Sequence, residues 1–135
     1  MSAPSSDLAT LLRTMNPVLH EGVFAFVSVP VETDLDGLDV VATMREDEGR
    51  SLVLREADAR ARGFPSRFRA AWITLAVASD LHAVGFTAAV AQTLAAAGIA
   101  CNVIAGAHHD HLFVPVAKSA DAMSALRTLQ DAGGR

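Results

Sequence analysis

The sequence predicts an α+β fold, and three observations support this prediction. Residues 72–116 read in order as an apolar strand, an Ala-rich helix between Gly85 and Gly98, and two further strands. Residues 1–65 add strand-like apolar runs and short helices of their own. The chain has 135 residues, of which 51% are hydrophobic and 19% charged, so it can bury a substantial core.

The first half of the chain consists mainly of predicted strands. Asp7 is placed to cap a short helix that Pro17 ends, and the apolar run over residues 23–29 predicts a strand buried on both faces. The next elements are a loop over residues 32–39, two strands over 40–45 and 51–55 joined by a turn that ends at Gly49, and a helix over 56–62. Residues 66–70 are the predicted boundary between the halves.

The second half places a longer helix between strands. Residues 71–77 predict a strand, and Ser79 and Asp80 are suitable N-caps for a helix that runs to about residue 97. The buried stripe of this helix is predicted to consist of Phe86, Val90 and Leu94. Strands over residues 100–105 and 112–116 and a helix beginning at Ser119 complete the half. A doubled ferredoxin-like β-α-β-β-α arrangement accounts for this order most simply.

Charge and cysteine content disfavour several classes of protein. The net charge is −4, and the acidic residues concentrate in residues 1–64, which disfavours a basic nucleic-acid surface. No apolar run reaches the roughly 20 residues needed to span a bilayer. The single cysteine, Cys101, cannot form an internal disulfide, and the N-terminus does not resemble a signal peptide. We therefore expect a cytoplasmic protein.

Several segments resemble a known family. Gly85 and Gly98 lie thirteen positions apart, as the glycines around the first helix of ACT domains do. The segments EDEGRSLVL (46–54), WITL (72–75), AVG (83–85) and NVIAGAHHDHLFVP (102–115) are similar to an uncharacterised bacterial group with two tandem ACT-like halves. The resemblance implies ferredoxin-like βαββαβ plaits with adjacent antiparallel sheets, a degenerate half over residues 1–65 and a second half over 66–135. It also implies a regulatory, ligand-binding role.

The junction between strand and helix at residues 79–87 is the candidate ligand site. Free N–H groups at a helix N-terminus attract a carboxylate, and Gly85 allows a ligand close to the backbone. The candidate ligand-binding residues are Asp80, Val84, Gly85, Phe86, Thr87, Asn102 and Val103. In the competing interpretation, Ser79 and Asp80 only cap the helix, and Gly85 only permits tight packing. The family pattern of an Asp two residues before a Pro-Gly pair is absent, since Asp80 lies further upstream.

The turn from His108 to His111 is the candidate metal site. On a strand, His109 and His111 share a face, and His82 or Asp80 would have to supply a third ligand. The alternative is a hydrogen-bonded polar turn in which Asp110 fixes an imidazole tautomer. Cys101 near these histidines suggests a thiol nucleophile, but we favour the interpretation of Cys101 as a small core residue on its strand.

The predicted function is a non-catalytic regulatory protein of ACT type that binds a small effector, most plausibly an amino acid, around Gly85. No catalytic residue and no cofactor is expected, and the predicted assembly is a homodimer without nucleic-acid or membrane partners. Two alternatives stay open: a metal-dependent enzyme that uses residues 108–111, and a structural dimerisation module.

Overall fold

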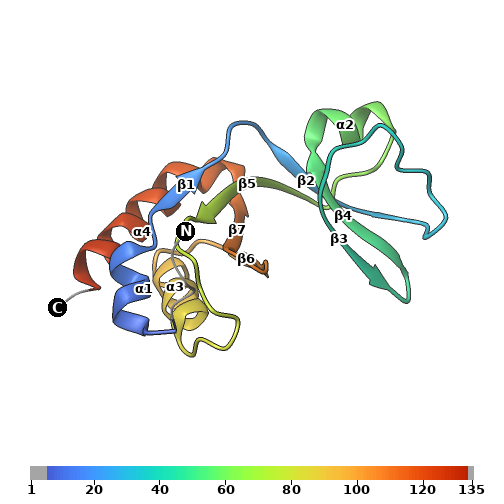
Figure 1. Cartoon of the computed structure of the whole chain (residues 1–135). Helices are drawn as coiled ribbons and strands as arrows, with labels where there is room; N and C mark the ends of the chain where they lie inside the picture. Colours follow the sequence, from blue (N-terminus) through green and yellow to red (C-terminus); the bar gives the residue numbers. More distant parts are fainter. Residues whose placement is uncertain (1–5, 134–135) are drawn as a thin grey trace. The chain divides into compact units, whose positions relative to one another are not determined.

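The computed structural model describes residues 6–133 and divides into two compact units (Figure 1). Residues 21–71 form one of them, which we call the inserted unit. Residues 6–20 and 72–133 form the other, which we call the split unit because its two segments flank the inserted unit in the sequence.

The inserted unit contains a four-strand antiparallel arrangement with one helix. Its elements are β2 (Phe24–Val29), β3 (Val40–Glu46), β4 (Gly49–Arg55), α2 (Glu56–Ala61) and the start of β5 (Phe68–Leu75), in the sheet order β3-β4-β2-β5. Alternation along the strands sends every second side chain to the same face of the sheet. The core of the unit comprises Ala25, Val27, Val29, Leu52, Leu54 and Ala59.

A loop over residues 30–39 takes the place of a helix between β2 and β3 in the inserted unit. Leu35 and Leu38 are partly buried against the core of the unit. Arg62 Nη1 donates to the Asp34 carbonyl (3.2 Å) and Nη2 to the Asp36 carbonyl (2.6 Å). Two leucines, one bidentate arginine and two backbone turn hydrogen bonds therefore hold a segment that forms neither helix nor strand.

The split unit contains three α-helices and the remaining strands of the described residues. It begins with α1 (Leu8–Thr14) and β1 (Pro17–Leu19) and resumes within β5 at Trp72. The other elements are α3 (Phe86–Ala96), β6 (Asn102–Ala105), β7 (Asp110–Pro115), the 3₁₀ turn η1 (Val116–Lys118) and α4 (Ser119–Ala132). The sheet order is β1-β5-β7-β6, with β1 antiparallel to β5 and β6 antiparallel to β7.

Apolar side chains explain why these elements pack together. The stripe predicted on α3 is buried, with Phe86, Val90 and Leu94 at most 3% exposed. α1 begins as predicted, since the Asp7 carboxylate accepts a hydrogen bond from the Thr10 N–H. The other large buried side chains of the unit include Leu11, Met15, Ile73, Leu75, Leu112, Phe113 and Leu126.

The predicted fold class is confirmed, since each unit has the strand order of a ferredoxin-like plait. The sequence predicts a division into linear halves, 1–65 and 66–135, whereas the compact units of the structure place residues 6–20 with residues 72–133. Strand β1 completes the sheet of the split unit by pairing with Ile73, Thr74 and Leu75. Residues 1–5 and 134–135 of those halves lie outside the described residues. None of the described helices has the length and hydropathy to cross a bilayer.

Residues 68–70, within the predicted boundary, belong to strand β5. Two local predictions are wrong. The helix expected after Ser79 and Asp80 begins only at Phe86, because Gly85 adopts φ +94° and residues 80–85 lie mainly in turns and bends. Asp110 and His111 lie in strand β7, so the connection between β6 and β7 is shorter than the sequence predicts.

Candidate ligand-binding site

The loop between β5 and α3 is held by short-range hydrogen bonds. Asp80 Oδ1 accepts from the His82 N–H (2.9 Å), and the Asp80 carbonyl accepts from the Ala83 N–H (2.9 Å). The chain then enters α3 through Gly85, a left-handed conformation that a side chain would strain. No side chain of the described residues caps α3, so its first-turn N–H groups can serve a ligand.

A hollow of about 60 Å³ lies between this loop, the start of α3 and the ends of β6 and β7. Its polar lining comes from two carboxylates and two hydroxyls. The lining residues are Ser79, Asp80, Leu81, Ala83, Phe86, Thr87, Ala105 and Asp110. Within residues 6–133, no lysine or arginine contributes to this lining. The hollow therefore combines helix amides with negative side chains.

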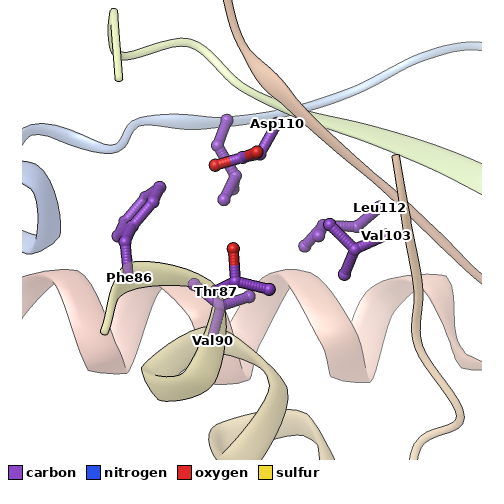
Figure 2. A pocket seen from close by; sticks show the side chains of 7 residues that line it. Phe86, Thr87, Val90, Val103, Asp110 and Leu112 are labelled. Atoms are coloured by element: carbon purple, nitrogen blue, oxygen red, sulfur yellow. The ribbon is translucent and has the colours of Figure 1, made fainter. Parts of the chain in front are cut away.

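An apolar crevice adjoins the hollow and shares Phe86, Thr87 and Asp110 with it (Figure 2). Its remaining walls are Leu75, Val90, Val103 and Leu112, which leave no space for a water molecule. Figure 2 shows the Thr87 hydroxyl pointing toward the Asp110 carboxylate. These two polar groups thus face each other where the hollow and the crevice meet.

Asp110 is the most constrained ionisable group of the site. It opposes Ala105 in the β6–β7 register and is only 8% exposed. Burial raises the pKa of its carboxyl group, although the Ser79 hydroxyl and the nearby His111 and His109 act in the opposite direction. Among the described residues the carboxylate accepts one long hydrogen bond, from Ser79 Oγ at 3.4 Å. A carboxylate has room for several more donors.

The histidines point to separate partners. His109 Nδ1 lies 3.0 Å from the Val77 carbonyl, which can only accept, so this nitrogen is the donor. His111 Nδ1 accepts from the Trp72 indole N–H at 3.1 Å, so this nitrogen carries no proton. Residues 6–133 contain no group of three or more His, Cys, Asp or Glu side chains placed to hold a metal ion.

A small network surrounds His111. Its Nδ1 lies 3.0 Å from Thr74 Oγ1, which is 2.7 Å from His20 Nε2, and the His20 ring stacks on Trp72 at 3.6 Å between centroids. Burial lowers the pKa of His111, and the neighbouring His109 and His20 act in the same direction. The network therefore favours the neutral imidazole, as its Trp72 hydrogen bond requires.

The structure brings together some of the predicted ligand residues. Asp80, Phe86 and Thr87 line the hollow, and Val103 lines the crevice. Gly85 is the N-cap of α3 and Val84 is 85% exposed, so neither forms a wall. Asn102 is exposed at the start of β6, opposite Phe113, and lines neither space.

Sequence reasoning includes Ser79 in the candidate junction but not among the ligand-binding residues, and it does not find Asp110 as a lining residue. It places Asp110 in a turn, although the two-residue spacing to Leu112 and Val114 puts this residue on the buried face of β7. Cys101 is partly buried, and burial raises the pKa of its thiol. A raised pKa disfavours the thiolate that nucleophilic catalysis needs.

Comparison with known proteins identifies the family. Two family models, both described as ACT domain, match residues 3–71 and 67–128. This chain belongs to the ACT-domain family. The resemblance predicted from the sequence is thereby confirmed, and ACT domains are regulatory modules that bind small-molecule effectors. Membership of this family supports a regulatory, ligand-binding role, and neither matching model describes a catalytic domain.

Solved structures show the same fold. A Vibrio cholerae protein of unknown function, described as a possible transport protein, has a TM-score of 0.82 and 43% identity, covering 91% of this chain and 95% of its own. The ligand-free regulatory subunit of aspartate kinase from Thermus thermophilus has a TM-score of 0.66 and 9% identity, covering 87% and 97%. An Agrobacterium tumefaciens protein has a TM-score of 0.64 and 17% identity, covering 84% and 87%. A search of curated proteins found no match.

Proposed function

We propose that this ACT-domain protein senses an amino acid, whose head group occupies the hollow beside the start of α3. The observation that carries the proposal is the combination of groups around this hollow. The start of α3, whose first-turn amides are uncapped, lies on one side, and Asp110, only 8% exposed, lies on another. A zwitterion needs both kinds of partner within a few ångströms.

The two ends of the ligand find different partners. Its α-carboxylate accepts from the first-turn amides of α3, where the helix dipole favours negative charge. Its α-ammonium donates to Asp110 and to the Thr87 hydroxyl, which face each other. Gly85 serves this arrangement without contacting the ligand, because its left-handed conformation ends the loop and starts the helix at Phe86.

The size of the hollow sets a limit on what is bound. A volume of about 60 Å³ accommodates a charged head group and not a large side chain. The ligand's side chain therefore extends past the exposed Leu81, which is 67% accessible at the rim, or opens the adjoining crevice.

The regulatory output comes from a change in subunit contacts. We place the protein in the cytoplasm and propose that it is a homodimer. The dimer is supported by β6, which is the terminal strand in the order of the split unit. One side of such a strand can pair with a second copy. Because Ala105 of β6 lines the hollow, ligand binding can favour one subunit arrangement over another.

Thermal unfolding in the presence of each standard amino acid tests the proposal. At a concentration about 100 times its Kd, a ligand stabilises the folded state by about 2.7 kcal/mol, which raises Tm by several degrees. The response is expected to weaken in Thr87→Val, which removes the hydroxyl at nearly constant volume. The matched control is Thr93→Val on the same helix, whose hydroxyl donates to the Ala89 carbonyl.

Two further measurements complete this test. N-acetylated and decarboxylated analogues of a bound amino acid should bind weakly, because each lacks one end of the zwitterion. Light scattering with and without ligand measures the subunit number. If no amino acid raises Tm at about 10 mM, the proposal is wrong.

A further inference from the structure

We infer that the hollow selects amino acids with a single carboxylate and rejects dicarboxylic ones, with Asp110 as the acceptor of the ligand's ammonium group. The inference rests on the proposed function and specifies its ligand class. It specifies which amino acids bind, whereas the proposed function states only that an amino acid binds.

The charge of the lining residues is the first reason. Asp80 and Asp110 both line the hollow, and no lysine or arginine of the described chain does. The amides of α3 are the positive end of a helix and can serve one carboxylate. A second carboxylate in the ligand would meet two like charges with no cation in the lining to pair with it.

The neighbouring crevice gives the second reason. Apart from the shared Thr87 and Asp110, its walls are entirely apolar. An aliphatic side chain can enter it if Val103 or Val90 moves, but a carboxylate there would lose its hydration without gaining a hydrogen bond. An acidic side chain is therefore disfavoured both in the hollow, which has two carboxylates in its lining, and in the apolar crevice.

The position of Asp110 gives the third reason. The residue is more than nine-tenths buried and accepts one hydrogen bond, 3.4 Å long, from Ser79 among the described residues. Burying such a carboxylate in its charged form lowers the stability of the fold unless a hydrogen-bond donor or a cation pairs with it. An ammonium group between Asp110 and Thr87 supplies further donors and a positive charge.

Isothermal titration with two isosteric pairs of ligands tests this inference. Asparagine and aspartate differ only in an amide or a carboxylate, as do glutamine and glutamate. We expect each acid to bind at least about tenfold more weakly than its amide, because its additional carboxylate is repelled by the carboxylates of the lining. A tenfold difference in Kd corresponds to about 1.4 kcal/mol. Neutral aliphatic amino acids should bind at least as tightly as asparagine.

Variants locate the source of the selectivity. Asp110→Asn should weaken binding of the neutral ligands about tenfold, because the ammonium loses its counter-charge. It should also reduce the ratio of the affinity for asparagine to the affinity for aspartate, because one repelling carboxylate is removed. Asp80→Asn should narrow the ratio with a smaller loss of affinity, and it serves if Asp110→Asn does not fold. Asp121→Asn in the first turn of α4 removes the same charge outside the hollow and should change neither quantity.

The outcomes separate this inference from the proposed function. Binding of aspartate as tight as that of asparagine overturns the inference and leaves amino-acid sensing standing. An unchanged ratio in both Asp110→Asn and Asp80→Asn overturns the assigned source of selectivity. If no amino acid binds at all, the proposed function fails and this inference fails with it.

Discussion

The two units share a strand order and differ in the segment that connects their first two strands. In the split unit, β5 leads into a loop and the eleven-residue helix α3, whose start borders the hollow. In the inserted unit, β2 leads into residues 30–39, where Leu35 and Leu38 pack on the core in place of a helix. The comparison shows that a ferredoxin-like plait survives without this helix, whereas the proposed ligand site requires it.

The largest expected effect comes from comparing the leucines that anchor these two segments. Leu94 on α3 is fully buried, so Leu94→Ala should lower the free energy of unfolding by about 2–5 kcal/mol. Leu38 is only partly buried, and Leu38→Ala should cost about 1 kcal/mol. Urea unfolding monitored by circular dichroism measures both. Equal costs would show that the loop is as tightly integrated as the helix.

Asp110→Asn should stabilise the protein while weakening ligand binding. The pKa of Asp110 is raised in the folded state, so its contribution to stability is present at acid pH and is lost as pH rises through the folded pKa. At pH 7 the asparagine should therefore raise Tm, because it removes the cost of burying the charged carboxylate. The difference should shrink below about pH 4. A fall in Tm at pH 7 would contradict this account.

Arg62→Lys should loosen the loop that replaces the helix. Lysine cannot donate to the Asp34 and Asp36 carbonyls in the same bidentate manner, and the loss should be about 0.5–1 kcal/mol. Hydrogen exchange should accelerate at residues 34–38. Arg67→Lys is the control, since Arg67 is an exposed arginine outside this loop. Unchanged exchange in Arg62→Lys would mean that the Arg62 hydrogen bonds are not needed to hold the loop.

The smallest effect concerns acid sensitivity of the split unit. The pKa of His111 is lowered in the folded state, so the stability it contributes is present above the unfolded pKa and is lost as pH falls below it. The stability should therefore fall as the pH is lowered from about 7 to 5.5. His111→Asn keeps an acceptor for Trp72 and should remove the effect, while His108→Asn should retain it. The fluorescence of Trp72, the sole tryptophan, measures the unfolding of both variants. Equal acid sensitivity in the two variants would exclude His111 as the source of the pH dependence.

Local patterns in the sequence predict the strands and helix stripes of both units, because buried faces impose a periodic spacing of apolar residues. They do not predict how the segments are grouped. β1 has three residues and pairs with β5 more than fifty positions later, and no local signal marks such a pairing. The sequence predicts too early a start for α3 because Ser79 and Asp80 are both good caps, although the left-handed Gly85 decides the actual start.

The candidate site is only partly predictable for the same reason. Asp80, Phe86 and Thr87 lie on one continuous segment, and the sequence indicates all three. Asp110 comes from a distant strand and stands among three histidines, a composition typical of a polar turn. Its burial depends on the pairing of β6 with β7, and the sequence pattern predicts that β7 begins two residues too late.

Nuclear magnetic resonance titration of the labelled protein with asparagine tests the difference between the two units most directly. Amide resonances of Thr87 and its neighbours in the first turn of α3, together with Asp110, should shift in a saturable manner, and those of residues 31–39 should not. Shifts confined to the inserted unit, or saturable binding that leaves Thr87 and Asp110 unaffected, would contradict the assignment of the site to α3.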